Sequence, residues 1–276
     1  MPVWVTNGNA PVGGLTAADF QLLDNGVPQP FTIATGDPPP MDVIVVLDVS
    51  GSVAGKALDQ LKVDVQRLNE QLHATDRLRL VTFARDVADV FGLQPGGAPV
   101  PVDRITSGGM TSFYNALAAA LMMSAADRPQ LVFAFTDGRD DASVLDAGQI
   151  VSLAERSNAA LYLAIVPGND RIAVSGTVRE QLANEYSLLR SIGPYLGGPN
   201  ISALRTAAAR TGGALYENPS NTQLPAIFKR VLDDFRSSYV LMFAPTSVAR
   251  PGWHDLTVRV TNTKFSVRAR KGYDGG

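Results

Sequence analysis

Asp48, Ser50 and Ser52 stand at alternate positions directly after the apolar run 43–47 (VIVVL). Carboxylates and hydroxyls supply only oxygen ligands, which suit a hard cation such as Mg²⁺ better than zinc or iron. A run that is apolar on both faces predicts a central strand of a parallel sheet, and open α/β sheets bind ligands at the carboxyl ends of such strands. The same residues also fit a plain turn that caps the next helix, so this loop alone leaves two interpretations open.

Two more oxygen-bearing side chains stand at comparable places. Thr111 lies just after the glycines at 108–109 and before an apolar helical pattern, and Asp137 closely follows the apolar run 131–135 (LVFAF). Because the carboxyl ends of parallel strands share one edge of a sheet, we expect all three loops to meet there. Three hydroxyls and two carboxylates could then form an octahedral oxygen site completed by water. Thr111, like Ser52, could instead cap the helix that follows it.

The elements that must position these residues alternate between strand and helix. Strands are expected at 43–47, 79–84, 87–92, 131–135, 161–166 and 214–217, and helices at 56–72, 112–126, 144–157, 201–211 and 222–236. This alternation predicts βαβ units, and therefore an α/β fold with a mainly parallel central sheet flanked by helices. Residues 168–200 fit the rhythm less well and contain one expected helix at 178–192. Their place after a buried strand predicts that they shape or cover access to the site edge.

Both ends of the chain have the pattern of β structure. Apolar residues alternate with polar ones near 20–33 and 256–269, and Asn25-Gly26 is a strong turn signal. Neither end has enough strands to bury a face by itself. We therefore expect a small β-sandwich formed by both termini, with the α/β domain inserted between its two parts. The expected divisions are 1–40, 41–238 and 239–276.

Composition excludes several classes of protein. The 276 residues contain 24 basic and 26 acidic side chains, so nucleic-acid binding has no electrostatic support. Cysteine is absent, which excludes disulfides and thiolate nucleophiles. The longest helical apolar stretch is too short to span a bilayer, and the first residues lack the pattern of a signal peptide.

Common catalytic patterns are also missing. Neither His73 nor His254 follows a strand at the predicted site edge, so a serine nucleophile would lack a base, and we expect both histidines at the surface. Phosphate-binding and dinucleotide-binding glycine motifs are absent. An Mg²⁺-dependent phosphotransferase with Asp48 as nucleophile is the enzyme alternative, although Ser50 stands where common aspartyl-phosphate enzymes carry a second Asp. We expect no enzymatic activity.

Three further pairs of residues have plain structural interpretations. Ser52 and Thr111 could be helix caps, as noted above. Met122 and Met123 lie in an apolar helical pattern and are expected in the core. Asp140 and Asp141 follow Asp137 closely, and we expect them to be solvated loop charges.

The three loops together resemble those of a von Willebrand factor type A (VWA) domain with a metal-ion-dependent adhesion site (MIDAS). Residues 48–52 (DVSGS) match the Asp-x-Ser-x-Ser loop of that family. Thr111 matches its isolated threonine, and Asp137 its aspartate at the end of the fourth strand. Residues 108–117 (GGMTSFYNAL) resemble its GGT-x-x-Tyr-x-Ala-Leu run, but the extra Met110 leaves Ser112 as a weaker candidate for the ligand.

Both flanks extend the resemblance. Residues 14–26 and 267–273 are similar to the opening and the end of a bacterial VWA-related subfamily. The likeness thus covers most of the chain outside roughly 168–200.

This resemblance implies a Rossmann-like VWA domain that works as a protein-binding or adhesion module. It implies a metal, Mg²⁺ with Ca²⁺ or Mn²⁺ as alternatives, held by Asp48, Ser50, Ser52, Thr111 and Asp137. The hydroxyls would bind directly and the aspartates mainly through water, which leaves a position for an Asp or Glu of a partner protein. It also implies a secreted or periplasmic protein, since bacterial relatives are commonly exported. A phosphoester-processing enzyme and a structural module with an unused metal site remain alternatives.

Overall fold

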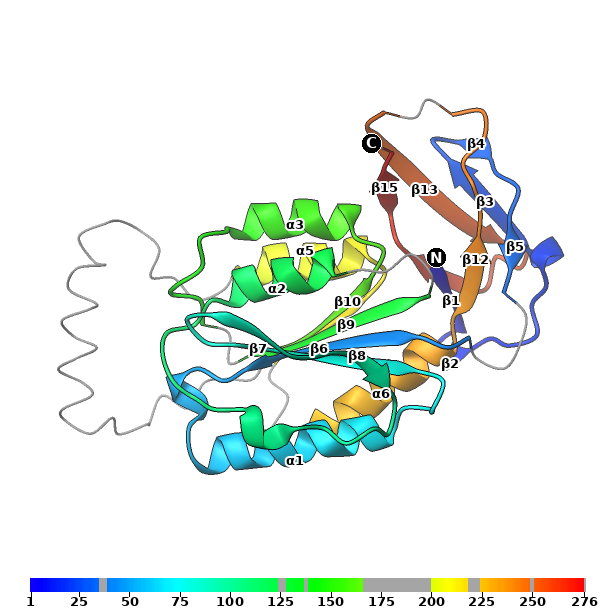
Figure 1. The fold of residues 1–276 in the computed structure, drawn as a ribbon. Coiled ribbons are helices and arrows are strands. Elements are labelled where there is room, and N and C mark those ends of the chain that lie inside the picture. The colour runs from blue at the N-terminus through cyan, green and yellow to red at the C-terminus, as the bar shows by residue number, and fades with distance from the viewer. Residues whose placement is uncertain are drawn as a thin grey trace.

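The computed structural model describes residues 1–34, 39–123, 128–136, 139–165, 200–217, 224–248 and 251–275. Asp137 and nearly all of the segment 168–200, including the expected helix at 178–192, lie outside these residues. The described chain forms a layered α/β body with a separate group of β-strands at one end (Figure 1). In that described part, no helix is both long and apolar enough to cross a membrane.

A six-stranded sheet forms the centre of the α/β body, and its strand order is β11-β10-β9-β6-β7-β8. The strands are β6 (Asp42–Asp48), β7 (Arg77–Phe83), β8 (Val87–Pro95), β9 (Gln130–Thr136), β10 (Ala160–Ile165) and β11 (Ala214–Glu217). All pair in parallel except β8, which runs antiparallel to β7 at the edge. The predicted mainly parallel sheet is confirmed.

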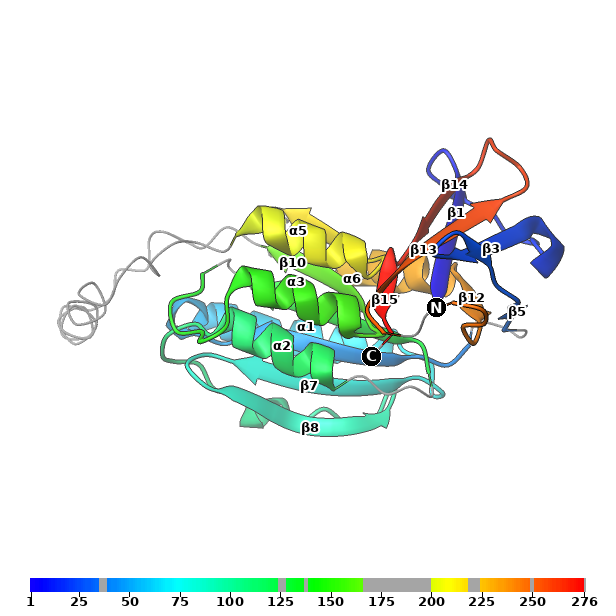
Figure 2. The same ribbon diagram turned by 90° about the horizontal axis from the view of Figure 1, so that it is seen from above.

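Helices cover both faces of this sheet (Figures 1 and 2). On one face lie α1 (Lys56–Glu70) and α6 (Leu224–Arg236), and on the other lie α2 (Phe113–Met122), α3 (Ala147–Arg156) and α5 (Ile201–Arg210). Short 3₁₀ helices are η1 (Ala17–Asp19), η2 (Gly51–Val53) and η3 (Val102–Arg104). Alternate side chains of β6 enter the two cores: Val43 and Val45 face α1, and Ile44 and Val46 face α2. This explains why the strand is apolar at every position.

The two chain ends form two antiparallel sheets together. One has the order β14-β1-β12-β5 with β2 beside β1, and the other has the order β15-β13-β3-β4. Their bounds are β1 (Pro2–Asn7), β2 (Ala10–Pro11), β3 (Phe20–Asp24), β4 (Val27–Pro28), β5 (Thr32–Ile33), β12 (Tyr239–Met242), β13 (Trp253–Val260), β14 (Ser266–Ala269) and β15 (Gly272–Asp274). Buried residues of both sheets share one apolar cluster that includes Val3, Phe20 and Leu241. The predicted joint β structure is therefore present, while the domain divisions at 40/41 and 238/239 stay a prediction.

One carboxylate joins the α/β body to these terminal strands. Asp234 on α6 accepts a hydrogen bond from the hydroxyl of Tyr162 on β10 (2.6 Å) and forms an ion pair with Arg268 on β14. Its backbone oxygen accepts a bond from Nε1 of Trp4 on β1 (2.7 Å), and the Arg268 guanidinium lies 4.1 Å from the centre of the Trp4 ring. Both chain ends are thereby fixed to the inserted domain.

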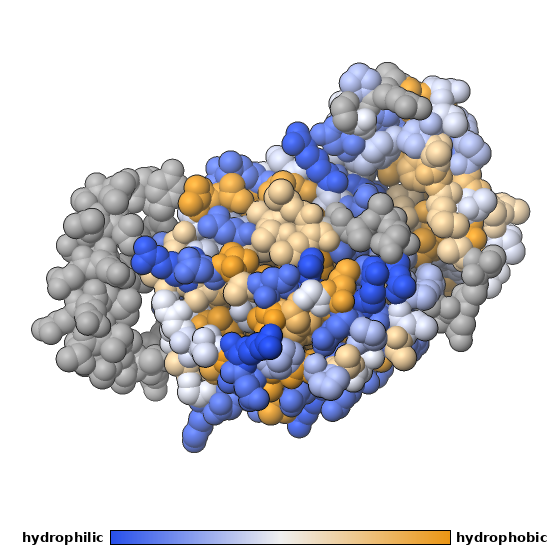
Figure 3. Space-filling model, viewed as in Figure 1, coloured by the Kyte–Doolittle hydropathy of each residue, from blue (hydrophilic) through white to orange (hydrophobic). Residues whose placement is uncertain are grey.

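Two expectations about exposure are wrong. His254 is buried, because it shares the inward face of β13 with Leu256, and its Nδ1 lies 2.8 Å from Oδ1 of Asp24. Met122, at the end of α2, is 73% exposed, whereas Met123 packs against the core. His73 is exposed as predicted. Over the face in Figure 3, apolar and hydrophilic residues are interspersed.

Gly213 allows β11 to approach β10 closely. A Cβ atom at this position would lie 1.9 Å from the backbone oxygen of Leu161. We expect Gly213→Ala to lower the free energy of unfolding by more than about 2 kcal/mol, because backbone cannot yield as a side chain can. Gly13→Ala is the matched control, since nothing lies within 4 Å of a Cβ there. Denaturant unfolding measures both variants. Equal midpoints for Gly213→Ala and Gly13→Ala would contradict the close approach of β11 to β10.

Asp64 is a buried acid on the core-facing side of α1. Its Oδ1 accepts a bond from Nε2 of Gln60 (2.9 Å), while its Oδ2 is buried with no partner in the described chain and lines a small apolar cavity of about 30 Å³ with Leu61 and Phe228. Burial raises the pKa of Asp64, and the Gln60 bond and Arg67 oppose that rise. The ionised carboxylate is therefore a cost to the fold.

We expect Asp64→Leu to raise the melting temperature at pH 7. Because the folded-state pKa of Asp64 lies above its ordinary value of 3.8, its protonated form favours folding, so the penalty is present above the raised pKa and is lost as the pH falls below 3.8. The advantage of the variant should thus shrink steadily in acid. Glu70→Leu, at an exposed site of the same helix, should change the free energy of unfolding by about 0.5 kcal/mol or less. If the gain in melting temperature of Asp64→Leu did not change with pH, the ionised Asp64 carboxylate would not be its cause.

Candidate metal centre

Asp48 is the last residue of β6, and its side chain is completely buried. Its Oδ1 accepts a hydrogen bond from the backbone N–H of Ser50 (2.9 Å). Its Oδ2 accepts one from the hydroxyl of Thr136 (2.8 Å), the last residue of the neighbouring strand β9. A buried carboxylate requires such donors. These two bonds therefore hold the carboxylate in one orientation at the carboxyl end of the sheet.

Backbone hydrogen bonds join the loop after β6 to the glycine-containing loop before α2. Gly108 N–H donates to the oxygen of Val49 (3.0 Å), and Gly51 N–H donates to the oxygen of Gly109 (3.1 Å). Gly108 and Gly109 both have positive φ angles, of 149° and 86°, which side chains disfavour. The meeting point lies beside β6, where the sheet order reverses between β7 on one side and β9 on the other. Ligand sites of open α/β sheets occupy this position.

The structure places three of the five predicted ligands, Asp48, Ser50 and Thr111, in these two joined loops. Ser50 is 2% exposed and Thr111 is 3% exposed. Ser52 lies in η2 within the same loop, and only its backbone belongs to the described residues. Asp137 lies outside the described residues and directly follows Thr136 in the sequence.

The helix-cap interpretations of Ser52 and Thr111 are wrong. The N-cap residue of α1 is Gly55, and that of α2 is Ser112; neither forms a side-chain cap hydrogen bond. The hydroxyl of Ser112 instead donates to the backbone oxygen of Arg85 (2.6 Å) and is buried.

Asp140 and Asp141 have a role that sequence reasoning missed. Asp141 Oδ1 accepts a bond from the backbone N–H of Thr111 (2.7 Å), and Asp140 Oδ2 accepts one from the N–H of Tyr114 (2.8 Å). Both residues are half-buried, so the expectation of solvated loop charges is wrong. Burial raises the pKa of Asp140, and its bonds to Tyr114 and Ser143 oppose that rise. These carboxylates cap the first turn of α2 and fix the backbone that carries Thr111.

Thr136 was also missed as a functional residue. It is a buried hydroxyl at the end of an apolar strand, and it follows Phe135, which pairs with Leu47 in the parallel register, so its place beside Asp48 follows from the strand pairing. The signal was present in the sequence, but reading it required the knowledge that β9 neighbours β6.

The donor set of this centre consists of oxygen atoms alone. Among the described residues, His, Asp and Glu side chains form no cluster of three that could hold a metal ion. The predicted centre differs from such a cluster, because hydroxyls supply most of its ligands and one of its two carboxylates lies beyond the described residues. Hydroxyl and carboxylate oxygens fit a hard divalent cation.

We expect Thr136→Val to lower the free energy of unfolding by about 1–3 kcal/mol in the presence of EDTA, because Asp48 then loses one of its buried donors. Thr206→Val on the exposed side of α5 removes a comparable hydroxyl bond, to the oxygen of Ser202 (2.9 Å), and should have an effect below about 0.5 kcal/mol. Thermal unfolding measures both. Equal effects would mean that the Thr136 bond does not hold Asp48.

Residues 43–139 match the family model of the von Willebrand factor type A domain. No curated protein matches the sequence at a significant level. Among solved structures, the chain is similar to protein BatB from Bacteroides thetaiotaomicron, with 19% identity and a TM-score of 0.50, over 70% of this chain and 98% of that one.

Two other solved structures share the fold over a longer part of this chain. A von Willebrand factor type A protein from Catenulispora acidiphila has 14% identity and a TM-score of 0.53, over 79% of this chain and 50% of that one. Proximal thread matrix protein 1 from the mussel byssus was solved with a zinc-occupied MIDAS motif. It has 14% identity and a TM-score of 0.53, over 77% of this chain and 49% of that one. The chain thus spans about half the length of these two proteins. Residues 43–139 therefore match the von Willebrand factor type A family, and the α/β body that contains them has the fold of that family.

Proposed function

We propose that this chain is an Mg²⁺-dependent protein-binding module that captures a carboxylate of a partner protein. The observation that carries the proposal is the pair of backbone hydrogen bonds that joins the loop 48–52 to the loop 108–111. These bonds join the loops that carry Asp48, Ser50 and Thr111 at the carboxyl edge of β6. The resemblance of both loops to the MIDAS sequence pattern supports the same function.

The proposed ligands divide into two roles. The hydroxyls of Ser50, Ser52 and Thr111 would bind the metal directly, and Asp48 and Asp137 would act mainly through water. Both oxygens of Asp48 already accept hydrogen bonds, which supports an orienting role for this residue. When bound, the cation supplies a Lewis-acidic position for an external carboxylate, and neutral hydroxyl ligands leave most of its charge uncompensated.

The same contacts argue against the phosphotransferase alternative. A nucleophilic aspartate needs a carboxylate oxygen that can reach the phosphorus atom. Asp48 is completely buried, and one of its oxygens is bonded to Ser50 while the other is bonded to Thr136. We therefore favour binding over catalysis.

Several features of the proposal come from the family resemblance. The metal is proposed as Mg²⁺, with Ca²⁺ and Mn²⁺ as alternatives, and zinc occupies the MIDAS motif in the mussel protein. The partner is proposed to present an Asp or Glu side chain. The site of action is proposed to be extracytoplasmic.

We expect isothermal titration calorimetry to detect Mg²⁺ binding in the absence of any partner, and we expect Asp48→Asn to abolish it. Asn keeps an acceptor for the Ser50 N–H but removes the charge that orients the ligands. Asp103→Asn, at an exposed site on η3, is the matched control and should bind Mg²⁺ as the wild type does. Parallel titrations with Ca²⁺, Mn²⁺ and Zn²⁺ identify the preferred ion.

Partner capture requires a second measurement on the same proteins. Proteins retained from a native lysate by the immobilised wild-type chain in Mg²⁺ should be released by EDTA and should not bind Asp48→Asn. Mg²⁺ binding without any EDTA-sensitive partner would favour a structural module. Equal partner affinity with and without chelator would refute the adhesion mechanism.

A further inference from the structure

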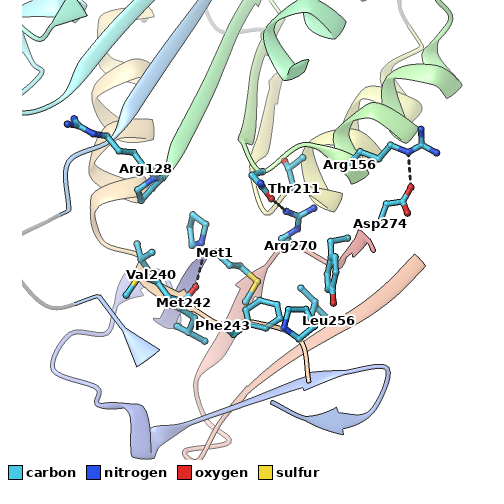
Figure 4. Close-up of a pocket in the computed structure, with 16 residues that line it drawn as sticks. Met1, Arg128, Arg156, Thr211, Val240, Met242, Phe243, Leu256, Arg270 and Asp274 are labelled. Carbon is cyan, nitrogen blue, oxygen red and sulfur yellow. Dashed lines mark hydrogen bonds and ion pairs between the residues drawn. The ribbon is translucent and has the colours of Figure 1, made fainter. Parts of the chain in front are cut away.

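We propose that the chain has a second binding site, for a small organic carboxylate with an apolar body, in a cavity between the α/β body and the terminal β-strands (Figure 4). This site involves none of the residues of the metal centre. The proposal is therefore independent of the function proposed above.

The cavity has a volume of about 550 Å³ and lies at the amino ends of the central strands. Pro129 precedes β9 and Asn158 precedes β10, whereas the metal centre lies at the carboxyl ends of β6 and β9. The opposite wall comes from the terminal strands, and it includes Leu241 and Leu256. A cavity of this size is within the range that holds small ligands.

Arg270 supplies a buried positive charge to this cavity. The residue is 8% exposed, and in Figure 4 it lies beside Thr211, with its guanidinium directed toward the α/β body. Its Nε donates to the oxygen of Gly272 (2.7 Å), one terminal nitrogen donates to Oδ1 of Asn158 (3.0 Å), and the other donates to the oxygen of Glu155 (2.8 Å). All three acceptors are neutral, and within the described chain the guanidinium forms no ion pair.

An unpaired buried guanidinium favours an anionic ligand. A guanidinium has five N–H donors, so the three bonds above leave one donor on each terminal nitrogen, an arrangement that suits the two oxygens of a carboxylate. Burial lowers the pKa of Arg270 to about 10, so the group stays charged at neutral pH. A bound anion would offset the cost of burying that charge.

The rest of the lining is apolar along one wall, and Arg270 is the one lining arginine of the described chain that is buried. In Figure 4 the Arg128 guanidinium points away from Arg270, and it donates to the backbone oxygen of Thr75 (2.8 Å). Arg156 pairs with Asp274 (2.9 Å), the one carboxylate among the described lining residues. The apolar wall is formed by Val240, Leu241, Met242, Phe243 and Leu256. An anionic head beside an apolar surface specifies an amphipathic ligand, such as a medium-chain alkyl carboxylate.

Octanoate is a suitable probe, with 1-octanol as its neutral counterpart. Measured by calorimetry in the presence of EDTA, the intact chain should bind octanoate at least about tenfold more tightly than 1-octanol, because only the carboxylate can pair with Arg270. Arg270→Gln should weaken octanoate binding by about tenfold or more. Failure to bind octanoate, or equal affinity for the alcohol, would overturn the proposal.

Arg270 also links structural elements, so a second variant is needed that cannot disturb the core. Met242 is 52% exposed at the apolar wall, and Met242→Glu should weaken octanoate binding by about threefold or more through charge repulsion. Val144→Glu makes the same change in charge at a residue that is 91% exposed and remote from the lining, and it should leave the affinity unchanged. Equal affinities for both variants would place octanoate outside this cavity and refute the site.

Discussion

The rest of the site depends on the buried carboxylate of Asp48. A charge at the end of a completely apolar strand is tolerated only if donors surround it, and the chain supplies them from its own loop and from the neighbouring strand. This requirement ties the Ser50 turn to β6 and makes Thr136 a hydroxyl where an apolar residue would otherwise continue β9. The loop before α2 is then attached through the backbone of Val49 and Gly51, and Asp141 fixes it from the other side. The oxygen site is thus the outcome of satisfying one buried charge.

The terminal strands are constrained in a comparable way. Asp234 on α6 is bonded to β10 through Tyr162, to β14 through Arg268 and to β1 through Trp4. Since β1 and β14 lie near opposite ends of the sequence, this junction closes the chain around the inserted domain. The cavity beside Arg270 follows from that closure, because one of its walls belongs to the α/β body and the other to the chain ends.

Much of this organisation was predictable from local patterns. The apolar runs and the helical stripes predicted the α/β body, and alternation at both ends predicted the joint β structure. Three kinds of feature required the fold itself. Two-residue strands such as β2 and β5 carry too little periodicity to detect. The bonds from Asp140 and Asp141 to α2 depend on which loops are neighbours in space. His254 was misjudged because its partner, Asp24, lies 230 positions away in the sequence.

Parallel strands also explain why two sites of opposite character can exist on one sheet. The loops that carry Asp48 and Thr111 meet at the carboxyl edge, where the proposed site offers oxygen atoms to a cation. The segments at the amino edge meet the terminal strands, where Arg270 is buried among neutral acceptors and needs a negative one. Among the described residues, Asp48 accepts hydrogen bonds from Ser50 and Thr136, whereas Arg270 has neutral acceptors and no carboxylate partner. The length of the central strands separates the two, so that a cation at one edge and an anion at the other would not compete for the same groups.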